Sequence, residues 1–193
     1  MSIIAKMENV RIAFMELNEP KSVNDGAPRY SAVFILEPGS KNEKKIRSTM
    51  KDVAIAKWGD KGEKILKKLI NDKRVCLGDG NQKTNKEGDT YDGFADMKFV
   101  NASSKTQPKT FDEDGMRVEP TESGIYAGCY VHGSVEIWAQ DNAYGQRVNA
   151  TLRAVKYSKD GQAFSGGTPV GDDEFDDITD GAGEDDFEDD DLV

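Results

Sequence analysis

Aromatic side chains recur at even spacing between residues 125 and 140, where they could stack on flat rings. Tyr126, Tyr130, His132 and Trp138 would share one face of a β-strand, because successive strand residues point to opposite sides. The other face would carry an aliphatic set that suits a core: Cys129, Val131, Val135 and Ile137. Stacking of nucleic-acid bases on such rings contributes about 1–3 kcal/mol per base and tolerates any sequence. The alternative is that the aromatic row itself packs in the core.

Basic side chains near these rings could neutralise phosphates. Arg147 and Arg153 share a face of the next alternating segment, and Lys105 and Lys109 lie in a long polar loop, where simple solvation is the alternative. Each neutralised phosphate releases counterions, so such binding would weaken as salt rises. Two further pairs of a ring and a cation belong to the second and third expected strands: Tyr30 with Arg29, and Phe94 with Lys98.

Five segments with alternating apolar residues could form the scaffold for these candidates. In the first, Val10, Ile12 and Phe14 share one face; in the second, residues 32–36 are apolar on both faces, which indicates a central strand. Turn formers at 141–145 join the last two segments into a hairpin. We predict a mainly β protein, a five-stranded OB-fold-like antiparallel barrel, whose strands span residues 3–17, 29–37, 91–101, 125–140 and 147–157.

A helical segment is expected after the second strand. Ser40 and Glu43 fit a capping box, and Ile46, Met50 and Val53 then recur on one helical face. A shorter helix over about residues 61–71 would bury four apolar side chains: Ile65, Leu66, Leu69 and Ile70. The sequence further predicts a short strand and a long loop, at residues 74–77 and 102–124.

The C-terminal residues differ sharply in charge from the rest. Residues 172–193 contain thirteen Asp or Glu and no Lys or Arg, which leaves 23 of the 36 acids in residues 1–171 to face all 26 bases. A run of like charge this dense cannot bury enough apolar surface to fold. We predict a folded domain over residues 1–167 and a disordered acidic tail over residues 168–193, which could compete for any groove built for another polyanion.

Composition narrows the class of protein. Hydrophobic residues make up 36% of the chain, and the apolar runs are too short for a membrane helix. The first eleven residues contain an acid and a base, unlike a signal peptide. Cys76 and Cys129, the only cysteines, lie among apolar neighbours. We expect both to be reduced core residues of a cytoplasmic protein.

The residue pattern does not support an enzyme. The single histidine, His132, has no serine or cysteine constellation around it, and the glycines at 78–80 and 166–167 lack the rest of a phosphate-binding loop. Asp89, Asp92 and Asp96 would not converge on a strand as a metal-dependent nuclease requires. We therefore expect no catalytic residue, no metal site and no cofactor.

The segments 101–108 (NASSKTQP) and 125–167, with the motif YAGCY at 126–130, resemble the bacteriophage single-stranded DNA-binding proteins, and residues 28–58 also fit. The resemblance implies an OB-fold domain over residues 1–167 that coats single strands during phage DNA replication and recombination. Related proteins carry an acidic tail ending in an aromatic residue. Here the implied contacts with replication proteins would come from Phe187, Asp189, Asp190, Asp191 and Leu192.

Two other functions stay open at this point. The chain could be an acidic interaction protein or DNA mimic whose tail is the active element. It could also bind RNA, because contacts to the 2′-hydroxyl cannot be recognised in a sequence. A homo-oligomer is possible, and the sequence does not predict its size.

Overall fold

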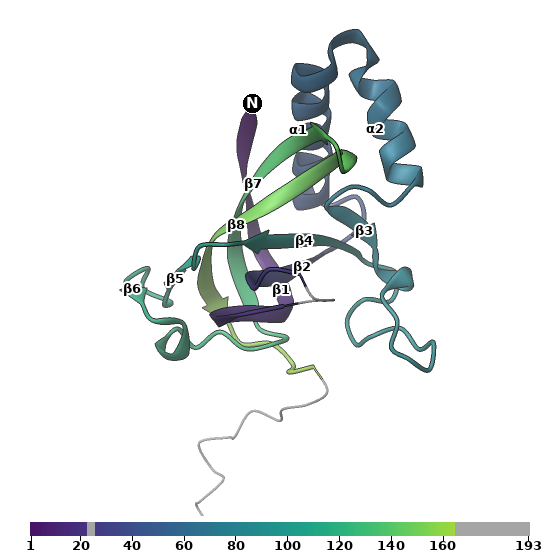
Figure 1. The fold of residues 1–193 in the computed structure, drawn as a ribbon. Coiled ribbons are helices and arrows are strands. Elements are labelled where there is room, and N and C mark those ends of the chain that lie inside the picture. The colour runs from purple at the N-terminus through teal and green to yellow at the C-terminus, as the bar shows by residue number, and fades with distance from the viewer. Residues whose placement is uncertain (23–25, 165–193) are drawn as a thin grey trace, which may run out of the picture.

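A computed structural model describes residues 1–22 and 26–164 of the 193-residue chain. Its main elements are two helices within a set of strands (Figure 1). In chain order they are β1 (Ser2–Lys21), β2 (Arg29–Leu36), α1 (Lys41–Trp58), α2 (Gly62–Asn71), β3 (Leu77–Asp79), β4 (Lys98–Ser104), β5 (Lys109–Phe111), β6 (Arg117–Val118), β7 (Tyr130–Asn142) and β8 (Gly145–Lys159).

Five of these strands close into a barrel, which confirms the predicted OB-like architecture. The hydrogen-bonded order β4-β2-β1-β7-β8 returns to its start through a parallel bridge between Ser103 of β4 and Thr151 of β8. The strands β1, β2, β4, β7 and β8 correspond to the five expected segments. As predicted, β2 is central, between β1 and β4. Because a single bridge joins β4 to β8, the barrel wall is weakest there.

The long strand β1 serves two neighbours in turn. Its first half pairs with β7 as far as Arg11, and its second half pairs with β2 from Arg11 onward. The register of β1 shifts near Asn9 and again between Ala13 and Glu16. Asn9 and Phe14 have positive φ angles of 50° and 43° at these irregularities. Such bulges bend a strand and redirect its side chains.

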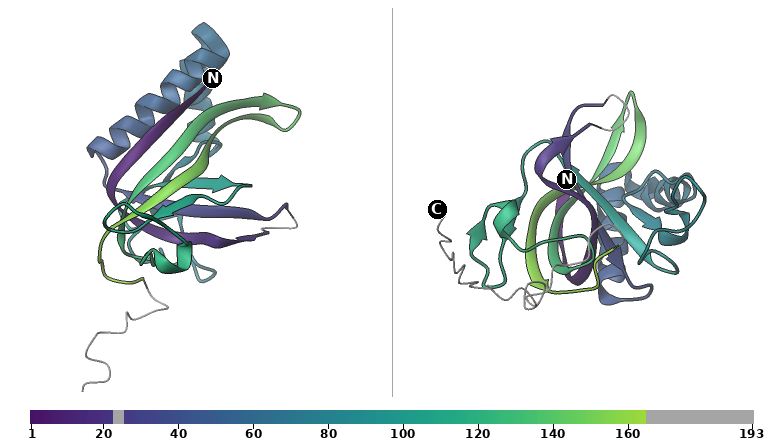
Figure 2. Two further views of the ribbon diagram at one scale, coloured as in Figure 1. Left: turned by 90° about the vertical axis from the view of Figure 1, so that its left-hand side faces the viewer. Right: turned by 90° about the horizontal axis from the view of Figure 1, so that it is seen from below.

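The helices follow β2 and cover one side of the barrel, where α1 contacts β1 and β7 (Figure 2). The predicted cap is present, since the Glu43 amide donates to Ser40 Oγ over 3.2 Å and Glu43 Oε2 accepts from the Gly39 amide. The apolar face of α1 is buried as expected. In α2, Leu66 and Leu69 are buried as predicted, but Ile65 is only half-buried and Ile70 is exposed.

The barrel interior is closely packed around Phe34 of β2. Gly133 of β7 faces this ring, and a Cβ atom on Gly133 would come within 2.6 Å of it. The aliphatic face of β7 lies in the same core, as the sequence predicted. Cys76 and Cys129 are free and buried, and burial raises the pKa of the Cys76 thiol to about 12. Both are therefore protonated core residues at neutral pH.

Three predicted strand boundaries were wrong. The expected strand over 91–101 forms only from Lys98, because residues 92–96 make turns. The strand expected from Ile125 begins at Tyr130, after a turn at residues 127–128. The short strand expected over 74–77 is β3, which begins at Leu77. The expected loop over 102–124 contains the end of β4 and the β5–β6 hairpin. For the segments 91–101 and 125–140, turn residues interrupt an apolar run that a period-2 pattern treats as continuous.

Candidate nucleic-acid interface

A groove of about 670 Å³ crosses the barrel where β4 meets β8. We call it the basic groove. Among residues 1–22 and 26–164, four cationic side chains line it and no carboxylate does. The lining residues come from β1, β2, β4, β7, β8 and the segments flanking β3: Phe14, Arg29, Ser31, Ala32, Val33, Lys73, Val75, Cys76, Lys83, Asn101, Ala102, Ser103, Trp138, Gln140, Arg147, Val148, Asn149, Ala150 and Thr151.

Trp138 supplies the aromatic surface predicted for this face of β7. It lies on the outward side of the strand. The buried positions Val135 and Ile137 precede it, and the hairpin tip follows it. Its indole Nε1–H donates to Thr151 Oγ1 of β8 over 3.0 Å. Because Trp138 is opposite Asn149 in the antiparallel register, Thr151 lies at the diagonal position. The ring is thus held in one orientation without a ligand.

Arg147 and Arg29, both predicted from the sequence, lie in the basic groove and are exposed. Arg147 is paired across the hairpin with Gln140, and Arg29 begins β2. Lys73 adds a third cation from the turn after α2. Within residues 1–22 and 26–164, none of these three side chains forms an ion pair. Their charge is therefore available to an anionic ligand.

Lys83 and Phe14 were not among the predicted site residues. Lys83 Nζ lies 5.1 Å from the centroid of the Phe14 ring and 5.4 Å from that of Phe99. Burial lowers the pKa of Lys83. Lys83 belongs to a polar loop without periodicity, so no pattern pointed to it. Phe14 was expected to share a face with Ile12, but the bulge turns its ring outward, to 43% exposure.

The structure does not support the predicted pairing of Phe94 with Lys98 as a base-and-phosphate contact. Phe94 is only 1% exposed and packs with Ala13, Val33 and Ile35 in a second small core cluster. Its ring therefore cannot stack a base in this structure. Lys98 Nζ lies 2.9 Å from Asp79 Oδ2, and hydrogen bonding to Lys98 lowers the pKa of Asp79. Lys98 lines a different cavity and not the basic groove.

The two predicted tyrosines of the YAGCY motif also lie outside the basic groove. Tyr126 precedes β7, and its hydroxyl donates to Asp160 Oδ1 over 2.9 Å and accepts from the Gly161 amide over 3.0 Å. Its ring lines an apolar pocket described below. Tyr130 begins β7, with Lys159 Nζ 4.8 Å from its ring centroid. Both rings take part in holding the end of the described chain.

The remaining predicted contacts are scattered. Lys105 and Lys109 are exposed beyond β4 and at the start of β5, and Tyr30 is half-buried; none of them lines the basic groove. Arg153 shares the outward face of β8 with Arg147 but pairs with Glu136 at 3.2 Å. The predicted tail contacts Phe187, Asp189, Asp190, Asp191 and Leu192 lie outside the described residues. Among the predicted contacts, Arg29, Trp138 and Arg147 are thus the ones that the fold brings together.

No group of three His, Cys, Asp or Glu in residues 1–22 and 26–164 is arranged to hold a metal ion. In the same part of the chain, no helix combines the length and apolar character needed to cross a membrane. His132 accepts a hydrogen bond at Nδ1 from the Asn9 amide over 3.4 Å.

Comparison with known proteins gives a consistent result. The family described as "Enterobacter phage Enc34, ssDNA-binding protein" matches residues 2–190. A curated relative, "Putative protein p50" of Acyrthosiphon pisum secondary endosymbiont phage 1, is 38% identical over 179 residues, which cover 90% of this chain and 93% of the relative.

The solved structures that resemble this chain are also phage single-stranded DNA-binding proteins. The C-terminally truncated single-stranded DNA-binding protein of bacteriophage Enc34 matches with 26% identity and a TM-score of 0.59, over 83% of this chain and 88% of that chain. The protein of the same phage in complex with ssDNA matches with 24% identity and a TM-score of 0.58, over the same shares. Bacteriophage T7 gp2.5, at 9% identity and a TM-score of 0.55, covers 94% of this chain and 97% of its own and shares the fold.

Proposed function

This chain belongs to the phage Enc34 family of ssDNA-binding proteins, and from that membership we propose that it binds unpaired DNA strands without regard to sequence. The observation that carries the proposal is the basic groove, in which the described lining residues include four cations and an indole ring but no carboxylate. A single strand offers both of the matching groups, namely a row of phosphates and unpaired bases with free π-faces.

Binding in the basic groove needs no chemical step. The guanidinium groups of Arg29 and Arg147 and the ammonium groups of Lys73 and Lys83 neutralise phosphates, while a base stacks on Trp138. The polar groups that line the groove, such as Asn101 and Asn149, hydrogen-bond to whichever base or sugar lies beside them. Because stacking and charge do not depend on base identity, the protein coats any sequence. We place this activity in phage DNA replication and recombination, in the cytoplasm of the host cell.

The acidic tail gives the site a built-in competitor. Its thirteen carboxylates follow a body that carries a small excess of bases. In the absence of DNA the tail occupies the basic groove or lies close to it. A bound strand displaces the tail, whose residues around Phe187 and Leu192 then recruit replication proteins. This order of events would make the tail accessible only on protein that already covers DNA.

Binding of equal-length oligonucleotides tests the function. Fluorescence anisotropy would measure affinity for single-stranded DNA, duplex DNA and RNA, each at two salt concentrations. We expect single-stranded DNA to bind more tightly than duplex, with a slope of log K against log salt of about −3, since each of four phosphate contacts contributes about −0.7. The RNA measurement reports any preference set by the 2′-hydroxyl.

Two outcomes would overturn the proposal. The first is the absence of binding at low ionic strength; the second is duplex binding as tight as that of the single strand. Should residues 1–171 ignore DNA while the full chain binds basic proteins through its tail, the chain would be an acidic interaction protein or DNA mimic instead.

A further inference from the structure

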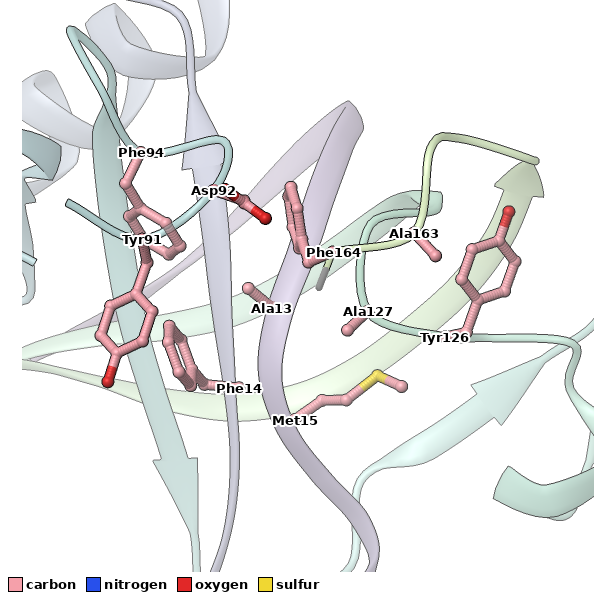
Figure 3. A pocket seen from close by; sticks show the side chains of 10 residues that line it. All are labelled: Ala13, Phe14, Met15, Tyr91, Asp92, Phe94, Tyr126, Ala127, Ala163 and Phe164. Carbon is pink, nitrogen blue, oxygen red and sulfur yellow. The ribbon is translucent and has the colours of Figure 1, made fainter. Parts of the chain in front are cut away.

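A second cavity, an apolar pocket of about 490 Å³, shares one lining residue with the basic groove. Figure 3 shows the side chains that line this pocket. Aromatic and small side chains from β1, from the turns before β4 and β7, and from the end of the described chain line it: Ala13, Phe14, Met15, Tyr91, Asp92, Phe94, Tyr126, Ala127, Ala163 and Phe164. Pockets of 300–1,000 Å³ are large enough for drug-sized ligands. No Lys or Arg is among the described residues that line the pocket, so it suits a flat neutral group better than a phosphate.

Phe14 connects this pocket to the basic groove, because its side chain lines both. Its ring meets that of Tyr91 edge-on, with centroids 4.9 Å apart. On the groove side, Lys83 Nζ lies over the same ring. A ligand that passes from the cations of the groove into the pocket must therefore cross Phe14.

The backbone of Phe14 is strained in a way that presents the ring. Its φ of 43° lies in the left-handed region, which costs a bulky residue free energy and is uncommon outside glycine. In a regular strand, residue 14 would lie on the same face as the buried Ile12, because side chains alternate between the two faces. The bulge instead leaves a large apolar side chain 43% exposed at the rim of two cavities. Strain of this kind concentrates at ligand-binding sites.

We propose that the apolar pocket is a base-binding subsite, in which a nucleobase of the strand held in the basic groove leaves the groove over Phe14 and lodges between Phe14, Tyr91 and Phe164. The inference rests on the proposed function. The occupant is a base because Phe14 lines both cavities, because the pocket's rings offer apolar surfaces to a base, and because no Lys or Arg is among the described residues that line the pocket, so a phosphate would find no counter-charge there.

The subsite predicts that Phe14 matters only for strands long enough to reach it. We would measure the affinity of the wild type and Phe14→Ala for oligothymidylates of about 4 to 16 nucleotides, the range that one OB fold covers. The variant should match the wild type on the shortest strands and fall about 5- to 150-fold behind on longer ones, the loss expected for one stacked base. Met116→Ala, which removes an exposed apolar side chain in the β5–β6 turn, is the matched control and should bind like the wild type.

A second variant separates the ring from the backbone. Phe14→Gly also lacks the ring, but glycine adopts a φ of 43° without strain. We expect Phe14→Gly to bind long strands as weakly as Phe14→Ala, while its unfolding temperature exceeds that of the alanine variant. If Phe14→Gly bound as tightly as the wild type, the ring would have no part in binding. A photocrosslink from a single 5-iodouracil, moved along the strand, should at one position label the peptides that carry Phe14 or Tyr91.

The next two outcomes would overturn the subsite and leave the proposed function intact. If Phe14→Ala weakened short and long strands equally, Phe14 would act within the basic groove. If its effect disappeared in protein truncated after Gly171, the pocket would hold the chain's own tail and not a base. If no variant and no wild type bound any strand, the proposed function itself would be wrong.

Discussion

At the scale of single residues, Trp138 is prepared for stacking because its indole N–H is already bonded to Thr151 Oγ1. Trp138→Ala should lose about 1–3 kcal/mol of affinity for single strands, the contribution of one stacked base. Trp138→Phe should recover part of that loss, since it restores a ring without the hydrogen bond. Anisotropy titration measures both, and tryptophan quenching on DNA addition should be lost in both variants. An unchanged affinity of Trp138→Ala would remove this ring from the site.

Arg147 contributes charge without a protein partner in the described part of the chain. Arg147→Gln should weaken binding of every sequence alike and reduce the salt slope by about 0.7, the value for one phosphate on a single strand. Lys67→Gln is a matched control, because Lys67 is an exposed lysine of α2 outside the basic groove. Equal slopes for the two variants would mean that binding responds only to net charge.

At the scale of elements, residues 160–164 form a strap that holds the end of the folded chain against the turn before β7. Tyr157 Oη donates to Asp160 Oδ1 over 2.8 Å, and the Tyr126 hydroxyl donates to the same oxygen. The Phe164 amide donates to the Ala127 carbonyl over 3.1 Å, and the Arg11 guanidinium lies 4.1 Å from the Phe164 ring centroid. This strap fixes the position of Phe164, the last residue before the C-terminal segment that the structure does not describe.

Close approach of the backbone makes the strap sensitive to Gly128. Its φ is 107°, and a Cβ atom there would come within 2.3 Å of the Gln162 carbonyl oxygen. Only glycine accepts both conditions without displacement of the strap. The YAGCY motif therefore needs glycine at position 128 in this chain because of the positive φ and the close approach of residue 162. The sequence pattern alone did not show this requirement.

Asp160→Ala should loosen the strap, with a pH dependence that identifies the carboxylate. Hydrogen bonds from Tyr157 and Tyr126 lower the pKa of Asp160 below its ordinary 3.8. A lowered pKa in the folded state stabilises the protein fully above 3.8, and this stabilisation is lost as the pH falls through the folded value. The unfolding temperature of the variant should therefore lie below that of the wild type at pH 7, and the gap should close in acid. A gap independent of pH would mean that the loss came from packing alone.

At the scale of the whole molecule, charge is divided between a slightly basic body and an acidic end. Deletion of residues 172–193 removes thirteen carboxylates. The truncated protein should bind single strands more tightly than the full chain, because the competitor for the basic groove is gone. The advantage should be largest at low salt, since screening over about 10 Å at 0.1 M weakens the tail's competition. Weaker binding by the truncated protein would contradict the competition.

The sequence predicted the features that depend on residues close together in the chain, and it missed those that depend on contacts between distant segments. The alternation in β7, the cap at Ser40 and the central position of β2 all follow from neighbours a few residues apart, and all were predicted. Phe94 was misplaced because turns at 92–96, not a strand, direct it into the second core cluster. Phe14 and Lys83 were missed because they lie 69 residues apart and meet only through a bulge in β1 and a loop after β3.

The sequence by itself determined the class of barrel, the inserted helices, the segregated acidic end and the resemblance to phage proteins of one family, because periodicity and charge composition are local properties of the chain. Only the tertiary structure decided which rings and cations share a surface. Barrel closure through the bridge between Ser103 and Thr151 brings β4 beside β8, and the left-handed backbone at Phe14 turns its ring outward. Both depend on contacts between distant segments that no local pattern encodes.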